Sequence, residues 1–198
     1  DTRGAQSLPA VQRDARALLG GDAVVASDNP TPEAFTARAR ELGLQVSHTL
    51  GFPTMARATD ERGGATKLVA LKAVELGYPL RGSLTVSTDA GLPGMPTREV
   101  PTAGEAWVEG PLLDALGVQV GDQLLLGNTS LRVSRVIVTE PDRGAGFMSF
   151  SPRVMIAQAD LVASGLIQPA SRISYRLAVA GADEAVASFV AWASAETK

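Results

Sequence analysis

The chain contains no cysteine, a single histidine and few aromatic residues. Without cysteine, it can form no disulfide, no thiolate metal site and no cysteine nucleophile. Aromatic residues make up 5% of the sequence, which leaves few side chains to stack on nucleic acid bases. Lys and Arg total 18 against 21 Asp and Glu, a net charge of −3 that provides no general attraction for polyanions. We therefore expect no nucleic acid partner.

Long apolar runs are also missing, since no stretch approaches the roughly 18 residues that a membrane-spanning helix requires. No signal peptide is visible, and the sequence begins at Asp1 and ends at Lys198 directly after a helical pattern. We interpret both ends as cuts from a longer protein. The composition, 45% hydrophobic and 20% charged over 198 residues, is that of a globular chain.

Periodicity predicts alternating helices and strands in the first part of the chain. Apolar residues at helical spacing predict a helix over residues 7–19, closed by Gly20 and Gly21. Alternating residues predict a strand over 44–52, which Lys67 to Val74 can join as a hairpin. A short buried strand (22–27) and a further helix (31–42) lie between them, so the opening unit is read as βαββ.

From Tyr78 onward, glycine and proline interrupt the pattern and indicate short strands and turns. Larger elements return after Pro152, where the alternation and apolar spacing predict a closing βαβα unit. The predicted fold class is therefore α+β, a ferredoxin-like split βαβ unit interrupted by a small β-rich module. We expect the discontinuous unit to comprise residues 1–77 and 151–198, and the inserted module residues 78–150.

The sequence offers little sign of catalysis. His48 is the one residue that a Ser-His-Asp relay could use, and it lies within an alternating strand, where a half-buried structural histidine is expected. No G-x-S-x-G elbow, phosphate loop or dinucleotide motif occurs with the required spacing. One histidine with scattered carboxylates does not make up a metal site. We predict no catalytic residue, cofactor or metal ligand.

The segment 140–150 places three large apolar residues after a charged, glycine-containing turn. Phe147, Met148 and Phe150 either fill the joint between the two modules or form an apolar surface that contacts a lipid-like cargo or a protein partner. We take them as candidate contact residues.

Several segments resemble the periplasmic core domain of MacB-type, FtsX-like ABC transporter permeases, closest to the YbbP-like branch. Their order and spacing fit over nearly the whole chain, although no single motif is decisive. The matching segments are residues 71–82, 106–109, 116–122, 140–143 and 151–156.

The resemblance implies a Porter-type α/β subdomain interrupted by a β-rich Sabre-type subdomain, on the periplasmic side of the bacterial inner membrane. Both ends of the chain would lie close together and face the membrane. Tyr78, Pro79, Leu80 and Arg81 would mark the crossing between the subdomains, and the return would begin at Glu140. These four residues, with Asp142 and Arg143, are the candidate hinge between the subdomains.

The resemblance also implies a function without catalysis in this domain. Such domains transmit conformational change driven by a separate cytoplasmic ATPase, reached through membrane helices, and work with a second permease copy or subunit. They move or release a hydrophobic or lipid-like substrate, or act on a periplasmic partner such as a lipase, a thioesterase or a carrier. Two alternatives stay open: a free-standing periplasmic lipid-binding or chaperone protein, and a weak esterase-type hydrolase that uses His48.

Overall fold

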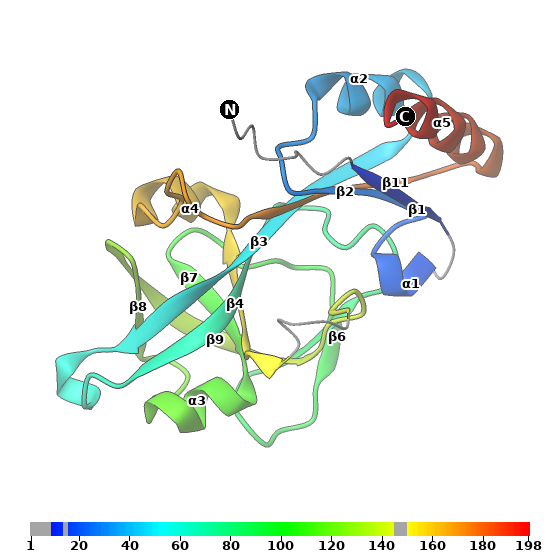
Figure 1. Cartoon of the computed structure of the whole chain (residues 1–198). Helices are drawn as coiled ribbons and strands as arrows, with labels where there is room; N and C mark the ends of the chain where they lie inside the picture. The colour runs from blue at the N-terminus through cyan, green and yellow to red at the C-terminus, as the bar shows by residue number, and fades with distance from the viewer. Residues whose placement is uncertain (1–8, 14–15, 145–149) are drawn as a thin grey trace.

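The computed structural model describes residues 9–13, 16–144 and 150–198, and in this part of the chain strands hold more residues than helices. Figure 1 shows the strands under a pair of helices, α2 and α5. The elements in chain order are β1 (Ala10–Arg13), α1 (Arg16–Leu19), β2 (Ala23–Ser27), α2 (Glu33–Glu41), β3 (Gln45–Ala58), the 3-10 helix η1 (Asp60–Arg62), β4 (Thr66–Val74), β5 (Leu84–Ser87), β6 (Met95–Thr97), β7 (Glu105–Glu109), α3 (Gly110–Leu116), β8 (Gln123–Leu126), β9 (Thr129–Thr139), β10 (Arg153–Ala157), α4 (Gln158–Ser164), β11 (Ser174–Ala180) and α5 (Asp183–Glu196).

One end of the sheet forms what we call the helix-covered layer: β1, β2, β11 and the first half of β3, beneath α2 and α5. Strand β11 lies between β2 and β3 and is antiparallel to both, so β2, α2 and β3 form a split βαβ unit. Apolar side chains of the strands and helices share one core here. Its large members include Phe35 of α2 and Phe189 of α5, both buried, with Trp192 packed against them.

The rest of the sheet closes on itself. Hydrogen bonds link β3, β4, β10, β7, β9 and β8 in that order, and β8 pairs with β3 again, which completes what we call the closed ring. Closure leaves these strands without a free edge, and their inward side chains fill the interior together with α3 and α4. Strands β5 and β6 extend the sheet beyond β9.

Strand β3 belongs to both parts. Residues 45–51 pair with β11 in the helix-covered layer, whereas residues 50–57 pair with β4 and residues 56–58 with β8 in the closed ring. The first and last described elements both lie in the layer, where Val11 of β1 packs against a core that includes Phe189 of α5. Strand β1 begins beside the end of β2, and α5 runs back along β11 toward that same edge, as Figure 1 shows.

One sequence expectation is wrong. Residues 10–13, expected in a helix over 7–19, form strand β1, and the helix covers Arg16–Leu19 only. The backbone of Ala10–Arg13 pairs with β2, and Val11 reaches the core of the layer. Strand pairing and burial thus outweigh a weak helical periodicity. Residues 7 and 8 lie outside the described residues.

The described structure is a mixed α and β fold built on a large sheet, as the predicted fold class requires in outline. The division into residues 1–77 with 151–198 and residues 78–150 stays a prediction. Side-chain packing groups β10 and α4 with the closed ring and not with the helix-covered layer. Among the described helices, none has the length and apolar character needed to cross a bilayer.

Candidate functional site

Five polar side chains meet inside the protein where the helix-covered layer and the closed ring adjoin. The ammonium of Lys72, in the middle of β4, donates to the carboxylates of Glu140 (3.0 Å) and Asp142 (2.9 Å) and to the Tyr78 hydroxyl (2.7 Å). The guanidinium of Arg153 donates to both oxygens of Glu140, at 2.9 and 3.1 Å. All five residues are buried, and we call them the ionic cluster.

The ionic cluster balances its own charge. Burial by itself would raise the pKa of Glu140, but the Lys72 and Arg153 cations outweigh burial and lower that pKa to about 2. Burial raises the pKa of Tyr78 well above its ordinary value, and the Asp142 and Glu140 carboxylates raise it further. At neutral pH, Glu140 is therefore ionised and Tyr78 is a neutral donor. Buried charges persist in such a site because each is paired and hydrogen-bonded.

The predicted crossing segment, residues 78–81, is bonded to both parts of the protein. Tyr78 donates to Asp142 at 2.5 Å, within the ionic cluster. Arg81 donates to both oxygens of Asp22 at 3.0 Å, and the backbone amides of Leu80 and Arg81 donate to the carbonyl of Gly20. Pro79 follows a cis peptide bond. The assignment of a hinge to this segment stays a prediction.

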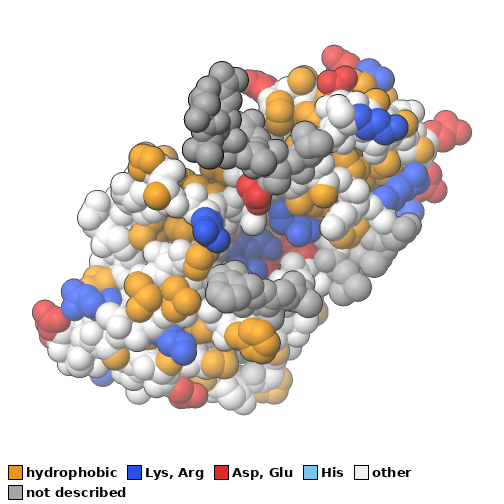
Figure 2. All heavy atoms as spheres, viewed as in Figure 1, with side chains coloured by type: hydrophobic (Ala, Val, Ile, Leu, Met, Phe, Trp, Pro, Cys, Tyr) orange, Lys and Arg blue, Asp and Glu red, His pale blue; other side chains and the backbone are white. Residues whose placement is uncertain are grey.

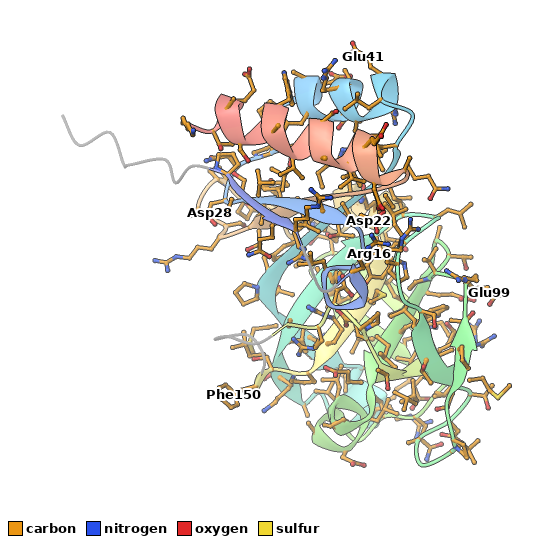
Figure 3. The ribbon with its side chains drawn as sticks, turned by 90° about the vertical axis from the view of Figure 1, so that its right-hand side faces the viewer. Arg16, Asp22, Asp28, Glu41, Glu99 and Phe150 are labelled. Atoms are coloured by element: carbon orange, nitrogen blue, oxygen red, sulfur yellow. The ribbon has the colours of Figure 1, made fainter. Side chains whose placement is uncertain are left out.

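Asp22, directly before β2 of the helix-covered layer, is the residue that binds Arg81 of the crossing segment. It also accepts the backbone N–H of Gly181 at 3.0 Å and lies 3.4 Å from the Arg16 guanidinium. Burial works to raise the pKa of Asp22, but the hydrogen bonds from Gly181 and Arg81 prevail and lower it. Figure 3 shows Arg16 and Asp22 where α1 meets the sheet.

The other predicted site residues lie apart from one another. Arg143 pairs with Glu109 at 3.2 Å and donates to the carbonyl of Ser151 at 2.6 Å. Phe150 is 92% exposed and projects outward in Figure 3, so it does not fill a joint. Phe147 and Met148 lie outside the described residues.

Sequence reasoning missed three members of the ionic cluster as site residues: Lys72, Glu140 and Arg153. A signal for two of them is present, because Lys72 is the one charge in the apolar run 68–74 and Arg153 directly precedes the apolar run 154–157. Such residues are rarely buried without a partner. The sequence alone does not show which carboxylates pair with them, since Glu140 lies 68 residues from Lys72.

An open cleft of about 350 Å³ lies over the ionic cluster, where β3 passes from the layer to the ring. Figure 2 shows Lys and Arg side chains gathered in this central hollow. The cleft is lined by Thr49, Leu50, Gly51, Phe52, Pro53, Ala70, Leu71, Lys72, Asp142, Arg143, Arg153, Arg172, Ser174 and Arg176.

His48 contacts both a hydroxyl and a carboxylate, the groups a hydrolytic relay uses. Its Nε2 lies 2.9 Å from Oγ1 of Thr36, and its Nδ1 lies 3.5 Å from Oε1 of Glu75. The hydroxyl is not accessible to a substrate, however, because Thr36 is 7% exposed, and none of the three residues lines the cleft. Glu75 also accepts the backbone N–H of His48, so these contacts connect α2, β3 and the residue that follows β4. Within the described residues, no group of three His, Asp or Glu is placed to hold a metal ion.

None of the available protein-family models matches the chain. A curated relative is an ABC transporter permease, and the two sequences are 29% identical over 182 residues. The match covers 92% of this chain and 21% of the relative, so the chain spans about a fifth of that protein. The relative is the uncharacterized ABC transporter permease YbbP of Escherichia coli (strain K12). The resemblance predicted from the sequence is confirmed: nearly the whole chain is homologous to part of such a permease.

The solved structures include a similar fold, the extracellular domain of the noncanonic ABC-type transporter YknZ from Gram-positive bacteria. It has 12% sequence identity and a TM-score of 0.49, over 83% of this chain and 86% of that chain.

Proposed function

We propose that this chain is the extracytoplasmic domain of an ABC transporter permease, on the periplasmic side of the bacterial inner membrane. The observation that carries the proposal is the homology of 92% of the chain to a segment of YbbP. This homology favours the permease over a free-standing periplasmic lipid-binding or chaperone protein. In this role the domain transmits conformational change from a cytoplasmic ATPase, through membrane helices, to a substrate or partner outside.

The placement of the terminal elements supports a mechanical role. Strand β1 and helix α5 meet in the helix-covered layer, so force entering through either end of the chain would act first on that layer. Strand β3 continues from the layer into the closed ring. The segment 78–81 also links the two parts, because Tyr78 donates to Asp142 and Arg81 pairs with Asp22. In the proposed function residues 1–77 with 151–198 act as the Porter-type part, and residues 78–150 supply the Sabre-type part.

The proposed partners are a second permease copy or subunit, the ATPase, and a periplasmic lipase, thioesterase or carrier. The substrate class would be hydrophobic or lipid-like. Phe150 supports a contact of that kind because its large apolar side chain is exposed shortly before β10 begins.

A spin-label experiment on the full permease with its ATPase tests transmission. Glu41, exposed on α2, is replaced by cysteine and labelled, and pulsed electron paramagnetic resonance measures the distance between the two copies. This chain has no cysteine of its own to compete for the label. We expect the distance distribution to change when ATP is trapped. Identical distributions with and without nucleotide would contradict transmission.

A second label pair tests the hinge separately. Cysteines at Glu41 and at Asp114, exposed on α3, report on the layer and the ring within one copy. A pair at Asp114 and Gln123, both on the ring, is the control and should keep one distance. We expect nucleotide to change the first pair only. If the first pair also stays constant while the copies move, the domain moves as one body and residues 78–81 are no hinge.

A further inference from the structure

One face of the sheet continues from the cleft to the outer surface of the closed ring. Strands β3 and β4 pair Gly51 with Lys72, Pro53 with Ala70, and Met55 with Leu68. Because side chains alternate between faces, these residues all lie on the cleft side. The small floor residues Gly51, Pro53 and Ala70 leave the cleft open above them. Measured along β3 from Thr49 to Met55, this face is about 20 Å long.

The wall contributed by β11 and the residues just before it carries two cations on this face. Arg176 pairs across the strands with Thr49, and Arg172 lies four residues earlier; both line the cleft. Among the described residues, neither makes an ion pair with a carboxylate, although Arg176 donates weakly to the carbonyl of Leu19 at 3.4 Å. Two guanidinium groups that face an open cleft form a site suited to a carboxylate or a phosphate group.

The acidic residues nearby do not neutralise these arginines. Asp142 lines the cleft, but both of its oxygens are bonded, to Lys72 and to Tyr78. Asp28 lies with Arg172 in an adjoining hollow and has its own interactions. The chain carries a net charge of −3, so the positive charge is a local property of the cleft. An anion would be attracted to this point and not to the surface in general.

The far end of the same face is apolar and exposed. Met55 is 51% exposed and its cross-strand partner Leu68 is 40% exposed. Phe150 is 92% exposed and precedes β10, whose Arg153 pairs with Ala70 of β4, two residues beyond Leu68. In Figure 2, hydrophobic side chains border the basic hollow. Exposed apolar groups that adjoin a charged cleft indicate a binding surface with two chemical ends.

We propose that this cleft binds a single-chain anionic amphiphile. Its carboxylate or phosphate head group lies between Arg172 and Arg176, and its alkyl chain lies over Pro53 and Ala70 toward Met55 and Leu68. A cleft one strand pair wide accommodates one extended chain. The proposal deepens the proposed function, on which it rests, by naming the class of cargo.

Isothermal titration of the 198-residue chain with dodecyl phosphate, below its micellar concentration, tests the proposal. Inorganic phosphate represents the head group alone, and octyl glucoside represents an apolar chain without an anion. We expect one dodecyl phosphate to bind per chain, at least tenfold more tightly than either. Equal affinity for inorganic phosphate would reduce the cleft to a small-anion site. Equal affinity for octyl glucoside would mean that the two arginines do not contribute to recognition of the ligand. Either result overturns the proposal, as does displacement by an acidic peptide at equal concentration.

Matched variants locate the two ends of the ligand. Replacing Arg172 and Arg176 together by glutamine should weaken binding about tenfold or more, because charge-assisted hydrogen bonds are lost. Replacing Met55 and Leu68 by glutamine should weaken it about fivefold, because apolar contact is lost. All four residues are partly or fully exposed, so the variants should keep the melting temperature of the parent chain.

The controls are Arg40→Gln on α2 and Met95→Gln on β6, which remove similar exposed side chains away from the cleft. They should bind dodecyl phosphate like the parent chain. Binding that is unchanged in the double arginine variant would overturn the proposal. If dodecyl phosphate does not bind but the spin-label distances still respond to nucleotide, the proposed cargo is wrong and the proposed transport role stands. The two experiments therefore distinguish failure of one proposal from failure of the other.

Discussion

Glu140 keeps its charge in the protein interior because two cations surround it, which makes stability depend on pH. Its pKa is lowered from 4.5 to about 2 in the folded protein by Lys72 and Arg153, against the opposing effect of burial. A carboxyl group with a depressed folded pKa stabilises the fold above its unfolded pKa. That stabilisation, roughly 3 kcal/mol for a shift of this size, is lost as pH falls from about 4.5 toward 2.

We therefore expect the free energy of unfolding of the parent chain to fall over this acid range more steeply than that of Glu140→Gln. Near neutral pH, the variant should be the less stable protein, because Lys72 and Arg153 lose the carboxylate that both contact. Urea denaturation at several pH values from neutral to about pH 3 measures both curves. A gap between the two proteins that does not narrow with acid would show that Glu140 does not cause the dependence.

His48 presents the opposite case, a residue whose neighbours suggest catalysis but whose setting is structural. The Thr36 hydroxyl and the Glu75 carboxylate are within reach, but the hydroxyl is buried. We expect the purified chain to hydrolyse p-nitrophenyl esters no faster than buffer, and His48→Ala to leave that rate unchanged. Hydrolysis that disappears in both His48→Ala and Thr36→Val, with both variants folded, would establish the esterase alternative.

At the scale of elements, the local sequence pattern predicts a strand or helix well where its contacts in the fold are with residues nearby in the sequence. The strand expected from Lys67 to Val74 agrees with β4 within one residue, and the helix expected over 31–42 contains α2. The helix expected over 7–19 is wrong at residues 10–13, because β1 is stabilised by pairing with β2 and by contact with α5. Periodicity cannot report a partner that is distant in sequence.

The turn between β8 and β9 shows how closely one element of the ring packs on another. Gly127 has a positive φ of 52°, and a Cβ added there would collide with the carbonyl oxygen of Ser164 at the end of α4. We expect Gly127→Ala to lower the free energy of unfolding by about 3 kcal/mol, through strain and displacement of α4.

Gly43→Ala is the matched control, because Gly43 also has a positive φ but open space around it. It should cost only about 1 kcal/mol, the penalty of the left-handed conformation itself. Urea denaturation of the two variants gives the comparison. Equal losses would mean that the contact with α4 does not constrain this turn.

At the scale of the whole molecule, the two tryptophans report on different parts. Trp107 is buried on the outer side of the ring beside Tyr78, and Trp192 packs against Phe35 and Phe189 in the helix-covered layer. Because β3 runs through both parts and the segment 78–81 is hydrogen-bonded to both, we expect the whole chain to unfold as one cooperative unit.

The variants Trp107→Phe and Trp192→Phe each leave one tryptophan as a fluorescent probe. In each variant, the urea midpoint measured by tryptophan fluorescence should equal the midpoint measured by circular dichroism. A tryptophan transition that precedes loss of secondary structure in one variant only would reveal independent unfolding. That outcome would support a division of the chain into separate subdomains.

The sequence by itself determined the local elements, the absence of thiol chemistry and the resemblance to a permease domain, because these depend on composition and on short-range order. The tertiary structure alone decided that β8 closes the ring onto β3 and that Lys72 is buried among carboxylates from another strand's end. It also decided that Arg172 and Arg176 face an open cleft. The physical reason is that ring closure, charge pairing and cleft shape depend on contacts between residues tens of positions apart, and the free energies of those contacts are not expressed in any local pattern.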